Sequence, residues 1–142
     1  MNETIKKFGY PATLIKEFKH WLILLRPAQP TLGSLVLAAK GDAMAYGRLP
    51  RGAFVEQAEA VAAIEESLSN FCAYERINYL MLMMVDPNVH FHVIPRYSQP
   101  REWKGVAFTD AGWPGPPQLH NAIQLSPEQI EALAIDLSAN FR

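Results

Sequence analysis

One segment constrains the fold of this chain more than any other: residues 88–94, Asn-Val-His-Phe-His-Val-Ile, in which polar and apolar residues alternate. Alternation with a period of two is typical of a β-strand that has one buried face. Pro87 before the segment and Pro95 after it limit its length. We therefore predict a strand over residues 88–94, with its three apolar side chains in the core and Asn88, His90 and His92 on the opposite face.

The rest of the sequence predicts an α+β fold with a mostly antiparallel sheet, one long central helix and a C-terminal helix. Apolar runs predict strands over 20–25 and 35–37, which we expect to pair antiparallel, and a buried strand over 77–84. Helices are expected over 53–74 and after the Ser126 cap, with a short helical turn over 4–8. Segments 47–52 and 95–117, rich in glycine and proline, are expected to be loops. The expected buried stripe of the long helix is Phe54, Ala58, Val61, Ala62, Leu68 and Phe71.

Composition limits the classes of protein to which the chain can belong. A length of 142 residues fits a single domain, and the one cysteine, Cys72, cannot form an internal disulfide, which favours a reducing compartment. A net charge of −1 argues against a nucleic-acid polymer as partner, but it leaves a small anionic ligand possible. We expect neither a membrane span nor a signal peptide, and therefore a cytoplasmic protein.

The polar face of the strand over 88–94 is where chemistry is expected. Alternate residues of a strand are about 7 Å apart, so Asn88, His90 and His92 form a row. A neutral imidazole can attack phosphorus and form a phosphohistidine, while a second imidazole or an amide stabilises the phosphate oxygens. A His-x-His pair can also bind a metal ion, although a third ligand is then needed. The remaining histidines, His20 and His120, have no recognisable spacing, and we expect no metal or other cofactor.

Residues 78–97 resemble the signature of the histidine triad superfamily. The match is strongest over Val89–Arg96, where the family has three histidines that alternate with apolar residues, often followed by Pro-Arg. The upstream segment Leu32–Leu37 is similar to the family's Pro-Gly-His segment. The resemblance covers residues 20–97 and leaves 98–142 as a C-terminal loop and helix. It implies one histidine-triad-like domain over residues 1–142, usually dimeric, that binds nucleoside phosphates.

The resemblance also implies roles for individual residues. His90 corresponds to the nucleophile that becomes nucleotidylated, and His92 to the histidine that contacts phosphate oxygens. Asn78 and Arg96 are expected to bind substrate. The residues also leave other interpretations open: Arg96 as an exposed charge, and Asn78 as a buried hydrogen-bonding strand residue. The implied activity is that of a nucleotide hydrolase or nucleotidyltransferase, with a nucleoside phosphate or dinucleotide as substrate and a homodimer as the assembly.

Three departures from the family pattern bear on this activity. Asn88 replaces the first histidine, and Arg26 lies where many members have an acidic or amide residue that holds the ribose. Residues 82–85 lack the Gln-Ser/Thr pair that assists the leaving group. We still expect Asn88 to contribute to catalysis and Arg26 to bind substrate. The alternative is a nucleotide-binding module with weak or lost catalysis, and a weaker alternative is a metalloprotein.

Overall fold

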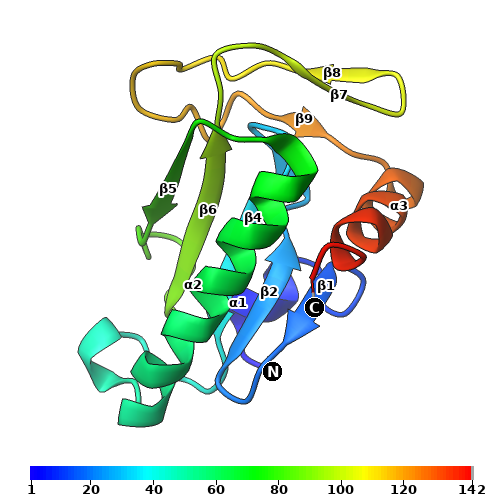
Figure 1. Ribbon diagram of the computed structural model, residues 1–142. Coiled ribbons are helices and arrows are strands. Elements are labelled where there is room, and N and C mark those ends of the chain that lie inside the picture. Colours follow the sequence, from blue (N-terminus) through cyan, green and yellow to red (C-terminus); the bar gives the residue numbers. More distant parts are fainter. Residues whose placement is uncertain (142) are drawn as a thin grey trace.

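The computed structural model describes residues 1–141 and is built around a five-stranded antiparallel sheet with the order β1-β2-β4-β6-β5. The strands are β1 (Leu14–Glu17), β2 (Trp21–Leu25), β4 (Leu35–Ala39), β5 (Arg76–Leu80) and β6 (His90–Arg96). Helix α2 (Arg51–Cys72) lies across one face, and the short α1 (Glu3–Lys7) lies behind the sheet on the other (Figure 1). The predicted α+β class with a mostly antiparallel sheet, a long helix and a C-terminal helix is confirmed.

Smaller elements surround this sheet, and the sequence patterns did not predict most of them. They are β3 (Ala28–Gln29), β7 (Arg101–Trp103), β8 (Val106–Phe108), β9 (Ile123–Gln124) and the 3₁₀ helix η1 (Tyr46–Arg48). Strands β7 and β8 form a hairpin inside the segment predicted to be a loop, through a turn in which Lys104 and Gly105 both have positive φ. Such turns favour Asn or Asp at the first position, so Lys104 gives no signal. Helix α3 (Pro127–Ser138) begins with the predicted capping box and lies beside β1 (Figure 1).

The predicted strands agree with the structure except at their ends. Strand β2 pairs with β4 from Trp21 opposite Ala39 to Leu25 opposite Leu35, which confirms the expected antiparallel pair. The strand predicted over 88–94 is β6, shifted toward its C-terminal end. The prediction of a buried strand over residues 77–84 is wrong over its second half, because β5 ends at Leu80 and Met83 has a φ of 50°. Residues other than glycine rarely adopt a positive φ, and a β-strand does not continue through a residue with such a backbone conformation. The first half of this segment is a strand, but none of its residues is fully buried, because β5 lies at the edge of the sheet.

Helix α2 buries a different stripe from the one predicted. Its buried residues are Ala53, Ala60, Ile64, Ser67, Leu68 and Cys72. Of the predicted set, Phe54, Ala58 and Ala62 are exposed, and only Leu68 is fully buried. Alanines occur on both sides of this helix, so apolar spacing alone could not identify the face that packs on the sheet. None of the helices within residues 1–141 is long and apolar enough to cross a membrane.

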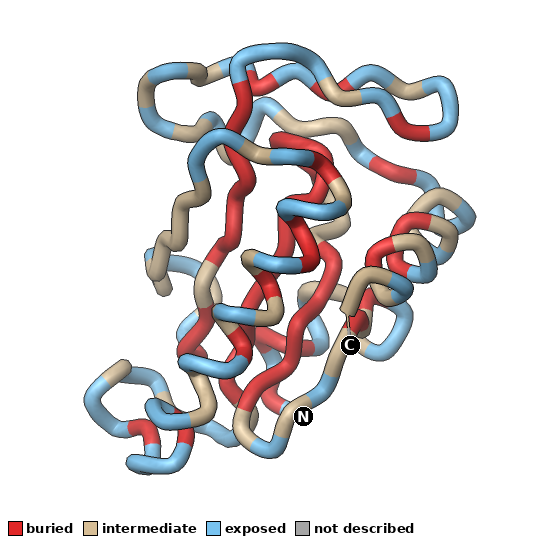
Figure 2. The backbone as a smooth tube through the Cα atoms, viewed as in Figure 1, coloured by how far each residue is buried: buried red, intermediate tan, exposed pale blue. Residues whose placement is uncertain are grey.

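The sheet separates two cores of unequal size. The larger lies between the sheet and α2, and the smaller lies under α1 with Ile5, Leu24 and Val36. In Figure 2 the buried residues follow the central strands and the inner side of α2. Phe91 of β6 points toward α2, since its ring lies 6.2 Å from that of Trp21. Because side chains alternate along a strand, the histidines of β6 point to the α1 side.

Candidate active site

The side chains of His90 and His92 lie next to each other on the α1 face of the sheet. In the pairing of β4 with β6, His90 is opposite Ala38 and His92 is opposite Val36. Both apolar partners belong to the smaller core under α1. The two imidazole rings are edge-on at 80°, their centroids are 5.2 Å apart, and both residues are buried. The structure thus brings together the two histidines that the sequence places on one strand face.

The backbone of Asn88 selects the tautomer of His90. Nδ1 of His90 lies 2.7 Å from the carbonyl oxygen of Asn88. A carbonyl oxygen can only accept a hydrogen bond, so Nδ1 carries the proton and Nε2 of the neutral ring keeps a free lone pair. Nε2 is therefore the atom of His90 that can attack an electrophile.

Arg26 selects the opposite tautomer in His92. Nε of Arg26 donates a hydrogen bond of 3.4 Å to Nδ1 of His92, so the neutral ring carries its proton on Nε2. Burial lowers the pKa of His92 to about 4, and electrostatic interactions with Arg26 and His90 act in the same direction, while Asp86 opposes them. At neutral pH the side chain of His92 is an uncharged hydrogen-bond donor.

The side chain of Asn88 attaches β6 to the N-terminal helix. Its Oδ1 accepts hydrogen bonds from the hydroxyl of Thr4 at 3.0 Å and from the backbone N–H of Thr4 at 3.4 Å. Its Nδ2 donates to the carbonyl of Asp42 at 3.4 Å. The backbone carbonyl of Asn88, rather than its side chain, is the group that contacts His90, and any residue at this position has such a carbonyl.

Two small hollows flank the histidines. One, of about 140 Å³, is lined by His90, His92 and the loop Leu82–Asp86. The other, of about 200 Å³, is lined by Lys7, Phe8, Arg26, Pro27, Ala28 and Gln124. Phe8 joins the two, because its ring centroid lies 5.5 Å from that of His90 and 5.7 Å from that of His92. A ligand at the histidines therefore has Phe8 and Arg26 as its next neighbours.

The loop that closes the first hollow is apolar and exposed. Met84 and Val85 are 86% and 80% exposed, and Leu82 is half exposed. Lys7 of α1 holds the loop through an ion pair of 2.7 Å with Asp86. Residues 82–85 offer no hydroxyl or amide side chain to a leaving group. No local sequence pattern predicts that Lys7 and Phe8 belong to the site, since they lie about 80 residues before the histidines.

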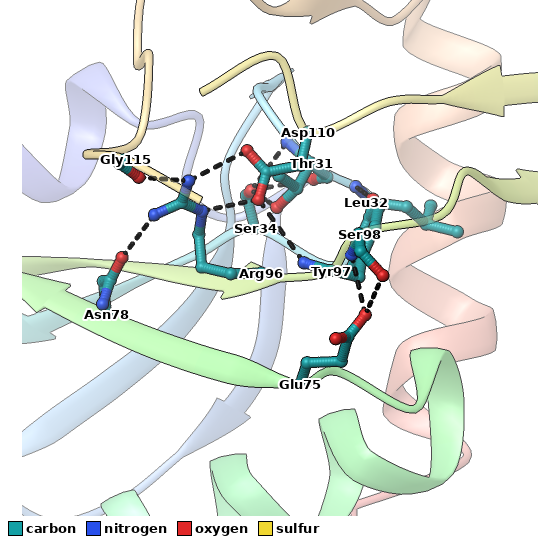
Figure 3. Close-up of polar contacts among 10 residues, drawn as sticks. All are labelled: Thr31, Leu32, Ser34, Glu75, Asn78, Arg96, Tyr97, Ser98, Asp110 and Gly115. Atoms are coloured by element: carbon teal, nitrogen blue, oxygen red, sulfur yellow. Dashed lines mark hydrogen bonds and ion pairs between the residues drawn. The ribbon is translucent and has the colours of Figure 1, made fainter. Parts of the chain in front are cut away.

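Arg96 lies at the other end of β6, roughly 20 Å from His90 at the rise of a strand. It is buried, and it forms an ion pair with Asp110 in which Nε donates to Oδ2 at 2.6 Å and Nη2 to Oδ1 at 3.1 Å (Figure 3). Nη2 also donates to the carbonyl of Gly115 and Nη1 to Oδ1 of Asn78, both at 2.8 Å. The structure does not bring Arg96 to the histidines, and it does not leave Arg96 exposed.

Asn78 lies on the edge strand β5, opposite Ile94 of β6, and is likewise separated from the histidines. Its amide oxygen accepts from Arg96, in agreement with a hydrogen-bonding strand residue, but Asn78 is half-buried rather than buried. Asn78 also lines a larger hollow, of about 790 Å³, between β5 and residues 113–117. Leu80, which pairs with His92, marks the end of this hollow nearest the histidines.

A third metal ligand is not supplied to the two histidines. Within residues 1–141 no group of three His, Cys, Asp or Glu side chains is placed to hold a metal ion. His20 lies beside Gly52 of α2, and its backbone N–H donates to Glu56, so it belongs to the other side of the sheet. His120 is exposed in the loop before β9.

The fold is similar to that of known histidine triad proteins. One from Bradyrhizobium japonicum aligns with a TM-score of 0.76 and 14% identity over 100% of this chain and 97% of that one. One from Sinorhizobium meliloti aligns with a TM-score of 0.73 and 19% identity over 99% and 96%. The diadenosine triphosphate hydrolase of Plasmodium falciparum aligns with a TM-score of 0.66 and 11% identity over 96% and 92%.

Comparison of the sequence alone finds no such relationship. No protein-family model and no curated protein sequence matches the chain. At identities of 11 to 19%, the agreement with solved structures is one of fold. The chain has the histidine triad fold, as the resemblance in residues 20–97 implied.

Proposed function

We propose that this chain is a divergent member of the histidine triad superfamily that cleaves or transfers a nucleoside monophosphate through a covalent intermediate on His90. The observation that carries the proposal is the contact of 2.7 Å between Nδ1 of His90 and the carbonyl of Asn88. It keeps the nucleophilic Nε2 unprotonated in the neutral ring. The hydrolase from Plasmodium falciparum, which has this fold, is named for diadenosine triphosphate, and this supports a nucleotide as the substrate.

The first step forms a bond between Nε2 of His90 and the phosphorus of the substrate. The bond from phosphorus to the leaving group breaks, and the leaving group departs with its electron pair. The ring of His90 becomes an imidazolium, whose Nδ1–H stays hydrogen-bonded to the carbonyl of Asn88. Nε2–H of His92 donates to a phosphate oxygen, where negative charge increases as the new bond forms.

The second step releases the nucleotide. Water, or another acceptor, attacks phosphorus, the bond to Nε2 breaks with its electron pair returning to His90, and the acceptor loses a proton. With water the net reaction is hydrolysis, and with a different hydroxyl or phosphate it is transfer. Because His92 is uncharged at neutral pH, it does not hold the phosphate by a full ion pair, which allows the product to leave.

The test is to replace His90 by alanine and to measure turnover of adenosine 5′-phosphoramidate and diadenosine triphosphate. We expect His90→Ala to lower kcat/KM of the folded protein by at least ~10³-fold, because it removes the nucleophile. Mass spectrometry at neutral pH should find a nucleotidyl adduct on His90 of the wild type. His120→Ala, a change at an exposed histidine, is the matched control. Full activity of His90→Ala would refute the proposed nucleophile.

The second candidate function is a nucleotide-binding module with weak or lost catalysis. Its supporting observation is the stretch 82–85, which has no side chain to donate a proton to a leaving group. Calorimetry with AMP and GMP distinguishes the two functions. Binding of either nucleotide without an adduct and without turnover of any substrate would favour the module.

We also propose that the chain forms a homodimer through the edge of β5. This strand pairs with β6 on one side only, so its other edge has unpaired backbone groups. Phe54 and Val55 are also exposed, but they lie on α2 and not on this strand edge. Light scattering should give twice the mass of one chain, and Ile77→Pro, which removes a donor in β5, should lower the fraction of dimer.

A further inference from the structure

Arg26 is a positive charge without a carboxylate partner beside the histidines. Within residues 1–141, no Asp or Glu oxygen forms an ion pair with Arg26, and the residue is only partly exposed. Burial lowers the pKa of Arg26, which means that its environment disfavours the charged form. A partly buried cation that is not neutralised by the protein costs stability. A bound anion would offset this cost.

The guanidinium of Arg26 has N–H donors that make no hydrogen bond within residues 1–141. Of its five N–H groups, Nε donates to His92 and Nη1 donates to the carbonyl of Ala28 at 2.6 Å. Nη2 has no partner among the described residues. The side chain lines the hollow of about 200 Å³, next to Lys7 and Gln124. Both N–H groups of Nη2 and the second N–H of Nη1 are thus available to a ligand there.

The backbone around Arg26 holds this side chain in place. Its N–H donates to the carbonyl of Ser34 at 3.1 Å, and its carbonyl accepts from Nε2 of Gln29 at 2.6 Å. Gln29 is itself fixed, since it is buried and its Oε1 accepts from the backbone N–H of Gly33. Such support is what a binding residue needs in order to keep its geometry when the ligand is absent.

The ring of His92 separates Arg26 from the reacting phosphate. Arg26 binds Nδ1 of His92, whereas the phosphate oxygen is expected at Nε2, on the other side of the imidazole. The free Nη groups therefore face a position different from the one at which His90 attacks. The histidines and Arg26 provide two anion positions rather than one.

We propose that Arg26 binds a second oxyanion of the substrate, a phosphate group other than the one that His90 attacks. The proposal rests on the proposed function and adds a second anion position, at Arg26, for nucleotides that have at least two phosphate groups. The second phosphate has two chemical sources, the ribose or the 5′-polyphosphate chain. Lys7 also lines this hollow, but its ammonium is paired with Asp86, so Arg26 carries the interaction.

The experiment measures binding by calorimetry with four probes: AMP, ADP, adenosine 2′,5′-bisphosphate and adenosine 3′,5′-bisphosphate. We expect at least one of the three diphosphorylated probes to bind about tenfold more tightly than AMP, the gain typical of charge-assisted hydrogen bonds. A gain with ADP identifies the 5′ chain as the source, and a gain with a bisphosphate identifies the ribose. Arg26→Gln should abolish the gain over AMP measured on the same variant, and Arg26→Lys should keep part of it.

The control is Arg48→Gln, which makes the same charge change at an exposed residue of η1 outside both hollows. It should leave the preference among the probes unchanged. Equal binding of all four probes, a preference that survives in Arg26→Gln, or no binding of any probe would overturn the proposal. The proposed function fails separately, through an active His90→Ala variant. Tm of Arg26→Gln adds a second readout: a purely structural Arg26 would lower Tm and weaken all probes alike.

Discussion

Two arginines on the same face of the sheet, Arg96 and Arg26, differ in how far the protein neutralises their positive charge. Arg96 is 4% exposed, and its guanidinium donates four hydrogen bonds, two of them to Asp110. Arg26 has two donors in use and no carboxylate partner among residues 1–141. The charge at one end of β6 is satisfied by the fold, whereas the charge beside the histidines is left for a ligand. The difference teaches that contacts, rather than residue type, distinguish a structural arginine from a binding one.

The largest effect is expected at the structural arginine. Asp110→Asn leaves Arg96 as a buried, unpaired charge, and such a change typically costs about 3–5 kcal/mol of unfolding free energy. Chemical denaturation measures the loss, and kcat of the protein that remains folded should stay near the wild-type value. The double variant Arg96→Met, Asp110→Leu is the control, and it should recover most of the stability. A stable Asp110→Asn variant with reduced kcat would break the comparison, because Arg96 would then serve the reaction.

The next largest effect is a pH dependence of the unfolding free energy that arises from His92, beside Arg26. The pKa of His92 is about 4 in the folded protein and about 6.5 when unfolded, so between these values the unfolded chain binds more protons. The contribution of His92 to stability is complete above pH 6.5 and is lost as the pH falls toward 4, by up to ~3 kcal/mol. Denaturation of wild type and His92→Asn across this range should show a difference that grows with acidity. Parallel curves would contradict the burial and charge effects assigned to His92.

A smaller effect is expected at Asn88, which touches the site through its backbone. Asn88→Ala removes the side-chain hydrogen bonds to Thr4 and Asp42 and keeps the one that its backbone N–H donates to the Thr4 hydroxyl, so it should cost about 1–2 kcal/mol of unfolding free energy. The carbonyl that accepts from His90 remains, so kcat should fall less than about tenfold. Thr4→Val is the control, since it removes the hydroxyl that contacts Asn88 and leaves the amide of Asn88 in place. A much greater loss of kcat in Asn88→Ala alone would show that the amide acts on the substrate.

The sequence predicted the parts of the site that depend on one strand. Alternation over residues 88–94 correctly placed His90 and His92 on one face, because side-chain direction in a strand follows from local geometry. It could not identify the face of α2 that packs on the sheet, since Ala58 and Ala62 fit the helical spacing as well as Ala53 and Ala60 do. Nor could it find Phe8 and Lys7, which reach the histidines only after α1 folds under the sheet.

The local sequence alone determined the strand, the pair of histidines on it and the capped C-terminal helix, because these follow from residues that are neighbours in the chain. Tertiary structure decided what each polar group does. It paired Arg96 with Asp110 fourteen positions away, brought Arg26 to His92 across 66 positions and tied Asn88 to Thr4 across 84. Electrostatic energy depends on distance and burial, which exist only once the chain has folded, so identical guanidinium groups acquired different roles.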